Sequence, residues 1–188
     1  MDMQGLPHMA EAPKETKACL DQLGKQLWRN KDPDALVRAH ISIYGLGTQS
    51  EELMRAAKAC ADENNVRFNM HQSQCIDDAD IDVRRFGRPA YVRWAEMGVL
   101  DENCVFVHNN ILRPEEVQPI VDSGMSLVWV PGNSMWYASR PKFPNRMPEL
   151  YHKGVNVALG TDISKTWTFG QNTFMAYYIA REERQWLS

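Results

Sequence analysis

Five short apolar segments, each followed by a stretch with helical spacing of apolar residues, constrain the fold of this chain most strongly. Short apolar runs between turn residues are typical of buried β-strands, whereas apolar residues three and four positions apart indicate amphipathic helices. Strand and helix signals that alternate predict a parallel sheet covered by helices, which is an α/β fold. The strand signals lie at residues 35–44, 66–71, 105–108, 126–130 and 155–159, and the helix signals at 12–30, 50–61, 89–97, 114–121, 147–152 and 173–186.

Length and composition fit one globular domain. The chain has 188 residues, of which 44% are hydrophobic and 24% are charged. We expect a single domain over residues 1–188, with a helical lead-in at 1–34 and βα repeats at 35–188, because domains commonly hold roughly 150 residues. A formal net charge of -3 leaves no basic surface for nucleic acid or anionic lipid.

The sequence also bears on the cellular compartment. No apolar run approaches the ~20 residues of a membrane helix, and the first residues lack the pattern of a secretory leader. The four cysteines are scattered, without a C-x-x-C pair, and we expect them to be reduced thiols. We therefore expect a cytoplasmic protein that contacts neither a membrane nor nucleic acid.

Polar side chains follow three of the predicted strands at the point where each strand ends. His71, His108 and Asp162 occupy these positions. In parallel α/β folds the functional groups gather at the carboxyl ends of the strands, where these three could share one metal or one substrate. Each residue also has a structural interpretation, because a histidine at a strand end is often simply hydrogen-bonded and an aspartate after Gly-Thr often caps a helix.

Several motifs resemble the amidohydrolase superfamily, in particular its cytosine-deaminase-like and chlorohydrolase-like metal-dependent hydrolases. The stretch Gly154-Val155-Asn156-Val157-Ala158-Leu159-Gly160-Thr161-Asp162 is the most specific of them. The resemblance covers roughly residues 41–184. The other motifs are His71-Gln72-Ser73-Gln74, Val107-His108 and Val130-Pro131-Gly132-Asn133-Ser134.

The resemblance implies a (β/α)8 barrel of the TIM type, of which the readable strands correspond to strands four to eight. It implies one divalent transition metal, Zn, Fe or Co, with His71 as a ligand. By the same resemblance His108 binds metal or polarises the substrate, and Asp162 binds metal and handles the proton of the attacking water. Asn133 matches the turn after the seventh strand only loosely and shapes the pocket. The implied activity is metal-dependent hydrolysis of a carbon–nitrogen bond, other than a peptide bond, in a small heterocyclic amide or carbamate-like substrate.

Two departures from the family pattern alter this expectation. Gln74, which we expect to contact the substrate, stands where the family commonly has a proton-shuttling glutamate. Its presence makes substrates with better leaving groups, such as halide or thiolate, more plausible. The His-x-His pair of the family's first strand is absent from the chain. We therefore expect a fragment that is inactive alone and requires the N-terminal half of the barrel or a homo-oligomer. The alternative is a non-catalytic α/β domain that binds a ligand or partner without metal.

Two further features allow more than one interpretation. Aromatic residues gather after the last two strands, where Trp136 and Trp167 either contact substrate in an apolar pocket, as we expect, or belong to the core. The acidic run at 77–82 is not an EF-hand, because Val83 and Pro89 stand where that loop, counted from Asp78, needs glycine and glutamate. We expect this run to be a solvated loop.

Overall fold

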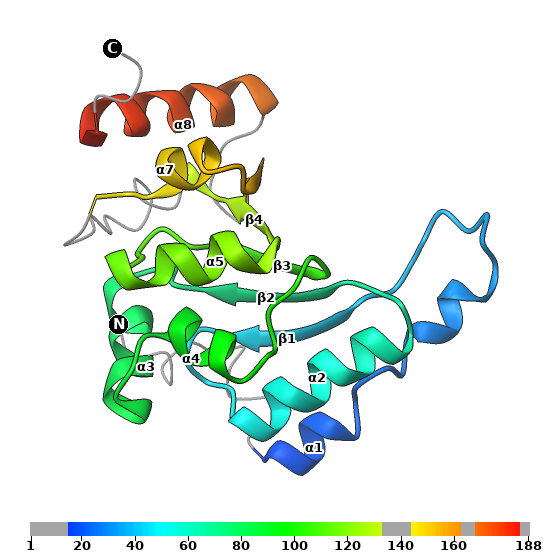
Figure 1. Cartoon of the computed structure of the whole chain (residues 1–188). Helices are drawn as coiled ribbons and strands as arrows, with labels where there is room; N and C mark the ends of the chain where they lie inside the picture. The colour runs from blue at the N-terminus through cyan, green and yellow to red at the C-terminus, as the bar shows by residue number, and fades with distance from the viewer. Residues whose placement is uncertain (1–14, 133–143, 163–167, 185–188) are drawn as a thin grey trace.

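The computed structural model describes residues 15–132, 144–162 and 168–184 and contains a sheet of five parallel strands (Figure 1). Their order in the sheet is their order in the sequence, β1-β2-β3-β4-β5, as in successive βα units of a barrel. The predicted α/β class and partial barrel arrangement are confirmed. The strands are β1 (Ile41–Gly45), β2 (Phe68–Gln72), β3 (Cys104–His108), β4 (Ser126–Trp129) and β5 (Asn156–Leu159).

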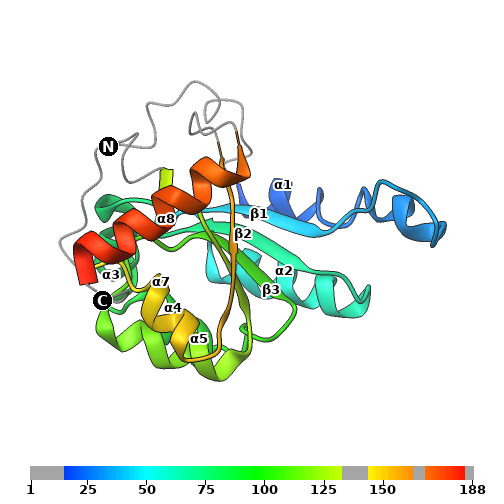
Figure 2. The same ribbon diagram turned by 90° about the horizontal axis from the view of Figure 1, so that it is seen from above.

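Helices follow the strands and cover one face of the sheet (Figures 1 and 2). The helix after β1 begins where the sequence predicts, since the Oγ of Ser50 accepts a hydrogen bond from the backbone N–H of Leu53 at 3.2 Å. The helical elements are α1 (Thr16–Leu20), the 3-10 helix η3 (Leu27–Lys31), α2 (Glu51–Glu63), α3 (Ile76–Phe86), α4 (Ala90–Glu96), the 3-10 helix η4 (Pro114–Glu116), α5 (Val117–Ser123), α7 (Met147–His152) and α8 (Phe169–Arg184).

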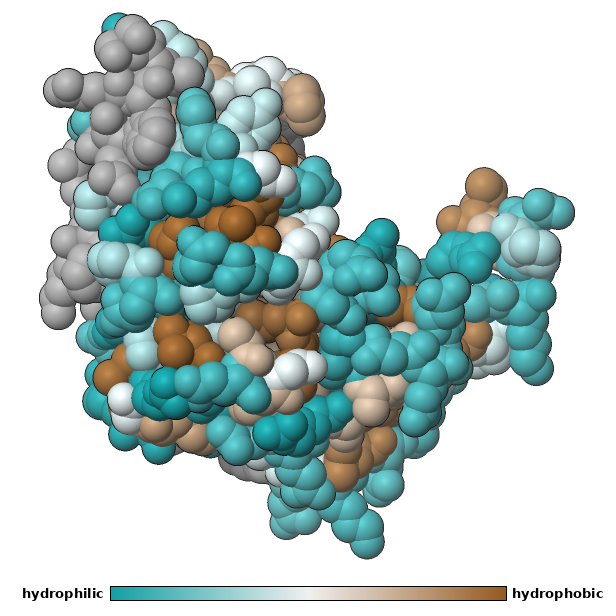
Figure 3. Space-filling model, in the orientation of Figure 1, coloured by the Kyte–Doolittle hydropathy of each residue, from teal (hydrophilic) through white to brown (hydrophobic). Residues whose placement is uncertain are grey.

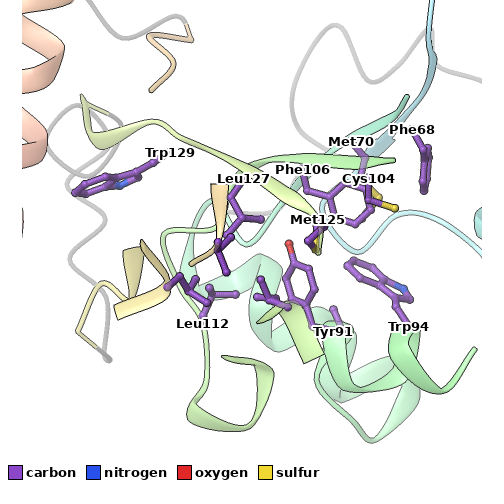
Figure 4. Close-up of a cluster of buried hydrophobic side chains, with 14 of the residues drawn as sticks. Phe68, Met70, Tyr91, Trp94, Cys104, Phe106, Leu112, Met125, Leu127 and Trp129 are labelled. Atoms are coloured by element: carbon purple, nitrogen blue, oxygen red, sulfur yellow. The ribbon is translucent and has the colours of Figure 1, made fainter. Parts of the chain in front are cut away.

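The main core lies between the sheet and this helical layer. Burial alternates along β2 and β3, so that Phe68 and Phe106 point toward the helices and meet edge to face at 5.4 Å. Tyr91 and Trp94 of α4 close this cluster from the helical side (Figure 4). The outer surface of the helices is largely hydrophilic, with separate apolar patches between them (Figure 3).

The opposite face of the sheet is less well covered by the described residues. Its side chains are half-buried in β3 and include exposed ones in β1 and β5, Ser42 and Asn156 among them. In a closed barrel this face points to the interior. The carboxyl ends of the strands, where it opens, carry the predicted site residues.

The acidic run was predicted wrongly. Residues 77–82 belong to helix α3, and Asp78 and Asp82 are fully buried rather than solvated. One carboxylate oxygen of Asp78 accepts the backbone N–H of Cys75 at 2.9 Å, which satisfies a donor at the start of the helix. Asp82 is neutralised by Arg93, whose Nη2 donates to it at 2.8 Å. Hydrogen-bonded carboxylates therefore stand on a buried helix face where apolar residues are usual.

The lead-in also differs from the prediction. The helix expected at 12–30 is reduced to α1 and η3, and Gly24 between them has a φ of 73° that interrupts helical geometry. The strand expected at 35–44 begins only at Ile41. The side chain of Asn30 bonds to both the N–H and the carbonyl of Ala39, at 2.7 and 2.8 Å, and occupies backbone groups that a strand would use.

The described residues contain neither a disulfide nor a helix that could span a membrane. The cysteines Cys19, Cys60, Cys75 and Cys104 all lie in described segments, and none forms a disulfide. Across the described ranges, no helix has both the length and the apolar character that crossing a bilayer requires.

Candidate functional site

His71, His108 and Asp162 lie together at the carboxyl ends of the strands. His71 ends the face of β2 opposite the helices, and His108 is the last residue of the neighbouring strand β3. Their rings are nearly parallel, with centroids 5.3 Å apart. The Nε2 of His108 is 4.0 Å from Oδ2 of Asp162, which follows β5. The structure thus brings together the three residues that the strand-end pattern predicts.

The backbone fixes the orientation of the His71 ring. Its Nδ1 lies 3.1 Å from the carbonyl oxygen of Tyr44, at the end of β1. A carbonyl only accepts, so Nδ1 carries the proton in this contact. The Nε2 of His71 is then the nitrogen with a lone pair available for a metal or a substrate proton.

His108 is held as a neutral imidazole. Its side chain is buried, and this burial, followed by the electrostatic effect of the neighbouring imidazole, lowers its pKa to about 4, although Asp162 raises it. At neutral pH a lone pair of His108 is therefore available as a ligand or hydrogen-bond acceptor. Asp162 is partly exposed and supplies the negative charge opposite the two rings.

The backbone at the site is unusual. Among the described residues, five at or just after strand ends have positive φ although none is glycine: Leu46 (54°), Ser73 (51°), His108 (79°), Asn109 (53°) and Asp162 (48°). Such conformations cost free energy and persist only where the surroundings impose them, and they gather at functional sites. Their concentration at the carboxyl ends of β1, β2, β3 and β5 marks this edge of the sheet.

The predicted substrate-binding residues are only partly placed. Gln74 is half-buried just after β2, and its backbone carbonyl accepts a hydrogen bond from the Nδ2 of Asn110 at 3.4 Å. Asn133, Trp136 and Trp167 lie outside the described residues. Two other aromatic residues near the last two strands are described: Trp129 is buried in the core, and Phe169 is exposed at the start of α8.

Comparison with known proteins relates the chain to deaminases. No family model matches it. It is 26% identical over 129 residues to a 5'-deoxyadenosine deaminase of Methanopyrus kandleri, a match that covers 69% of this chain and 29% of the relative. It is 29% identical over 133 residues to a 5-methylthioadenosine/S-adenosylhomocysteine deaminase of Halobacterium salinarum, covering 71% of this chain and 30% of the relative.

Solved structures share the fold of this chain. Guanine deaminase of E. coli matches with a TM-score of 0.75 and 20% identity, over 89% of this chain and 39% of that one. An adenosine deaminase of Xanthomonas campestris with bound zinc matches with a TM-score of 0.73 and 18% identity, over 84% and 35%. The predicted resemblance to the amidohydrolase superfamily is confirmed. The chain spans about a third of the length of these amidohydrolases.

The amidohydrolase-like residues suit a divalent metal in chemical type. Two imidazoles and one carboxylate are common zinc ligands, and tetrahedral binding places donor atoms roughly 3.3 Å apart. The 4.0 Å between Nε2 of His108 and Oδ2 of Asp162 is somewhat wider. Within the part of the chain that the structure describes, no three histidine, cysteine or acidic side chains stand close enough to hold a metal by themselves. The three residues therefore suit a metal by ligand type but do not form a complete site by themselves.

Sequence reasoning missed a buried polar layer behind the site. Gln72 alternates with His71 and points toward the helices, where its Nε2 donates to Asp82 at 3.1 Å. Arg93 completes this chain of contacts and also reaches Glu51 at 3.1 Å. Gly87, in the left-handed conformation at the end of α3, was the sequence signal that could have located the helix and its buried aspartates.

Glu116 is a second buried acid that the sequence did not single out. Its carboxylate oxygens accept the backbone N–H groups of Arg113 at 2.9 Å and Tyr91 at 3.3 Å. Burial nevertheless raises its pKa to about 7, since these two hydrogen bonds lower the pKa by less than burial raises it. Glu116 thus joins η4 to α4 and takes up a proton when the chain folds.

This proton uptake predicts a pH dependence of stability. The folded pKa of Glu116 is about 7 against an ordinary value of 4.5, so its contribution is present below pH 4.5 and is lost as the pH rises through 7. Relative to the Glu116→Gln variant, the wild type should lose about 3 kcal/mol of unfolding free energy over this range. Chemical unfolding of both proteins at a series of pH values measures the difference. The exposed neighbour Glu115 gives the control, Glu115→Gln, and a flat difference for Glu116→Gln would contradict the assignment.

Proposed function

We propose that this chain is the C-terminal part of an amidohydrolase-type, metal-dependent hydrolase that acts on a small heterocyclic substrate. The observation that carries the proposal is the meeting of His71, His108 and Asp162 at the carboxyl ends of β2, β3 and β5. The deaminase relatives support hydrolysis at a carbon that bears nitrogen. Adenine nucleosides are the first substrates to test, because the names of these relatives refer to them. We expect the enzyme to act in the cytoplasm.

Each residue has a role that its geometry allows. His71 would offer Nε2 as a metal ligand, because Nδ1 is engaged by Tyr44. Asp162 would be a second ligand and would accept the proton of the attacking water, then return it to the leaving group. A bound Zn, Fe or Co ion would lower the pKa of its water so that hydroxide forms near neutral pH. His108, neutral and buried, would be a further ligand or would hydrogen-bond the substrate where charge develops.

Completion of the site would require more ligands than the described residues supply. The inner face of the sheet is only partly covered by the described residues, and the chain spans about a third of its relatives. We propose that the N-terminal half of a barrel, or a second copy of this chain, covers that face and adds ligands. Metal affinity of the 188-residue chain alone should therefore be weak.

A titration tests this proposal. Cobalt would be added to the chain alone and to the chain with the product of any coding sequence upstream of Met1, and the visible spectrum would report metal bound to nitrogen and oxygen ligands. Release of ammonia from 5'-deoxyadenosine would report activity. We expect equimolar binding and activity only with the complement present. Absence of both would favour the second candidate, a binding domain without metal.

Gln74 gives a prediction about reaction type. Glutamine cannot shuttle a proton, whereas a glutamate at this position, just after β2, could exchange one with water and leaving group. Gln74→Glu should raise ammonia release from an adenine nucleoside by about 100-fold in the complete enzyme, the lower end of general acid–base contributions. Gln74→Met, which has no ionisable group, is the matched control. Equal rates for the glutamate and methionine variants would remove this position from the proton path.

A further inference from the structure

The backbone takes the left-handed conformation at two successive residues where β3 ends. His108 has a φ of 79° and Asn109 a φ of 53°. For residues with a Cβ this region is sterically disfavoured, and a run of two requires outside support. His108 is one of the proposed site residues, so the contacts that impose its backbone conformation also set the direction of its imidazole.

Asn109 provides the connection. It is fully buried, and its backbone N–H donates to the carbonyl of Gln72 on β2 at 2.8 Å. Its side-chain Nδ2 donates to the carbonyl of Phe106 at 3.0 Å, which folds the chain back onto β3. Its Oδ1 accepts a short hydrogen bond from the hydroxyl of Tyr91. Asn109 is therefore bound to its own strand, to the neighbouring strand and to helix α4.

Aromatic packing holds the Tyr91 side chain in place beside Asn109. Its side chain is fully buried, with its ring 5.2 Å from that of Trp94 and 6.2 Å from that of Phe106 (Figure 4). Burial raises the pKa of Tyr91 well above its ordinary value, so the phenol stays protonated and donates. The hydroxyl is the one polar handle of a residue otherwise packed against aromatic rings.

We propose that Tyr91 and Asn109 form a clamp that holds His108 in its left-handed conformation and so positions its imidazole beside His71 and Asp162. Tyr91 is a positioning residue, since it acts through Asn109. The inference rests on the proposed function for its catalytic meaning, but the clamp itself is a property of the metal-free chain. Loss of the Tyr91 hydroxyl would remove the bond that ties Asn109 to α4 and let His108 leave its place 5.3 Å from the His71 ring and 4.0 Å from Asp162.

The test compares two variants that each remove one buried heavy atom. Tyr91→Phe removes the hydroxyl of the clamp, and Cys104→Ala removes a buried sulfur at the opposite end of β3. In the chain labelled with 13C at histidine, we expect Tyr91→Phe to shift and broaden the imidazole resonances of His108, and Cys104→Ala to leave them unchanged. His152, exposed on α7, is the internal reference. Should Tyr91→Phe fail to fold, Asn109→Asp, which keeps an acceptor for Tyr91 but loses the bond to Phe106, makes the same measurement.

A zinc titration separates this proposal from the proposed function. In the complete enzyme Tyr91→Phe should weaken zinc binding by about 10- to 100-fold, the effect of losing a partner that orients a ligand, and Cys104→Ala should not. If the wild type binds no zinc but the His108 resonances still respond to Tyr91→Phe, the proposed function fails and the clamp stands. If the resonances of His108 change no more in Tyr91→Phe than in Cys104→Ala, the clamp is overturned.

Discussion

Replacing Arg93 by methionine should lower the free energy of unfolding of this chain by about 3–5 kcal/mol. The guanidinium is buried, donates to Asp82 at 2.8 Å and to Glu51 at 3.1 Å, and lies 3.8 Å from the ring centroid of Phe86. Asp82 is completely buried, and burial already raises its pKa against the opposing effects of Gln72 and Arg93. Without Arg93 this carboxyl group must either stay charged in a poorly solvated place or take up a proton at neutral pH.

A matched ion pair on the surface shows whether burial causes the large loss of stability expected for Arg93→Met. Arg88 and Glu96 also form an ion pair, but both side chains are 51% exposed. Arg88→Met should cost less than about 1 kcal/mol, because water screens exposed pairs. Urea unfolding followed by circular dichroism measures both variants. A loss in Arg93→Met no larger than that in Arg88→Met would mean that the buried pair contributes no more than a surface one.

The double variant Arg93→Met with Asp82→Asn measures the energetic coupling between the two residues. Removing both charges leaves no unpaired ion in the core, so the double variant should be more stable than Arg93→Met alone. If the double variant is less stable by the sum of the two single losses, the two residues act independently. The hydrogen bond between Arg93 and Asp82 would then contribute no energetic coupling.

The parts of the fold that the sequence predicted are those in which one side chain determines one local structure. Ser50 caps α2 through its own hydroxyl, and apolar runs bounded by turn residues gave all five strands. The first strand was predicted too long because its limit depends on Asn30, which binds Ala39 nine residues away. Propensity at residues 35–40 could not reveal a partner supplied by another segment.

The candidate site also has a part that the sequence predicts and a part that it does not. Strand-end positions predicted that His71, His108 and Asp162 would meet, because the carboxyl ends of parallel strands share one edge. The buried layer behind them was not predictable from spacing. Asp82 was read as solvated because a charged side chain is rarely buried, and only its contact with Arg93 in α4 explains its position.

Replacing His71 or Asp162 by alanine should abolish turnover by the complete enzyme and weaken zinc binding by more than about 100-fold. Loss of a residue that merely orients a metal ligand weakens metal binding by about 10- to 100-fold. Loss of the ligand itself should therefore weaken it by more. His71→Ala removes the nitrogen that the Tyr44 contact leaves available, whereas Asp162→Ala removes both a ligand oxygen and the proton acceptor. Zinc affinity measured by competition with a chelator, and ammonia release from 5'-deoxyadenosine, report the two effects.

Asp162→Asn distinguishes the two duties of this carboxylate. Asparagine keeps an oxygen that can bind a metal but cannot accept a proton, so zinc affinity should fall less than in Asp162→Ala while turnover falls equally. His152→Ala and Asp122→Asn, at exposed positions on α7 and α5, are the controls for surface changes of the same kind. Normal turnover in His71→Ala or Asp162→Ala would remove that residue from the site. A metal site at this edge of the sheet would then need ligands other than those that the strand ends supply.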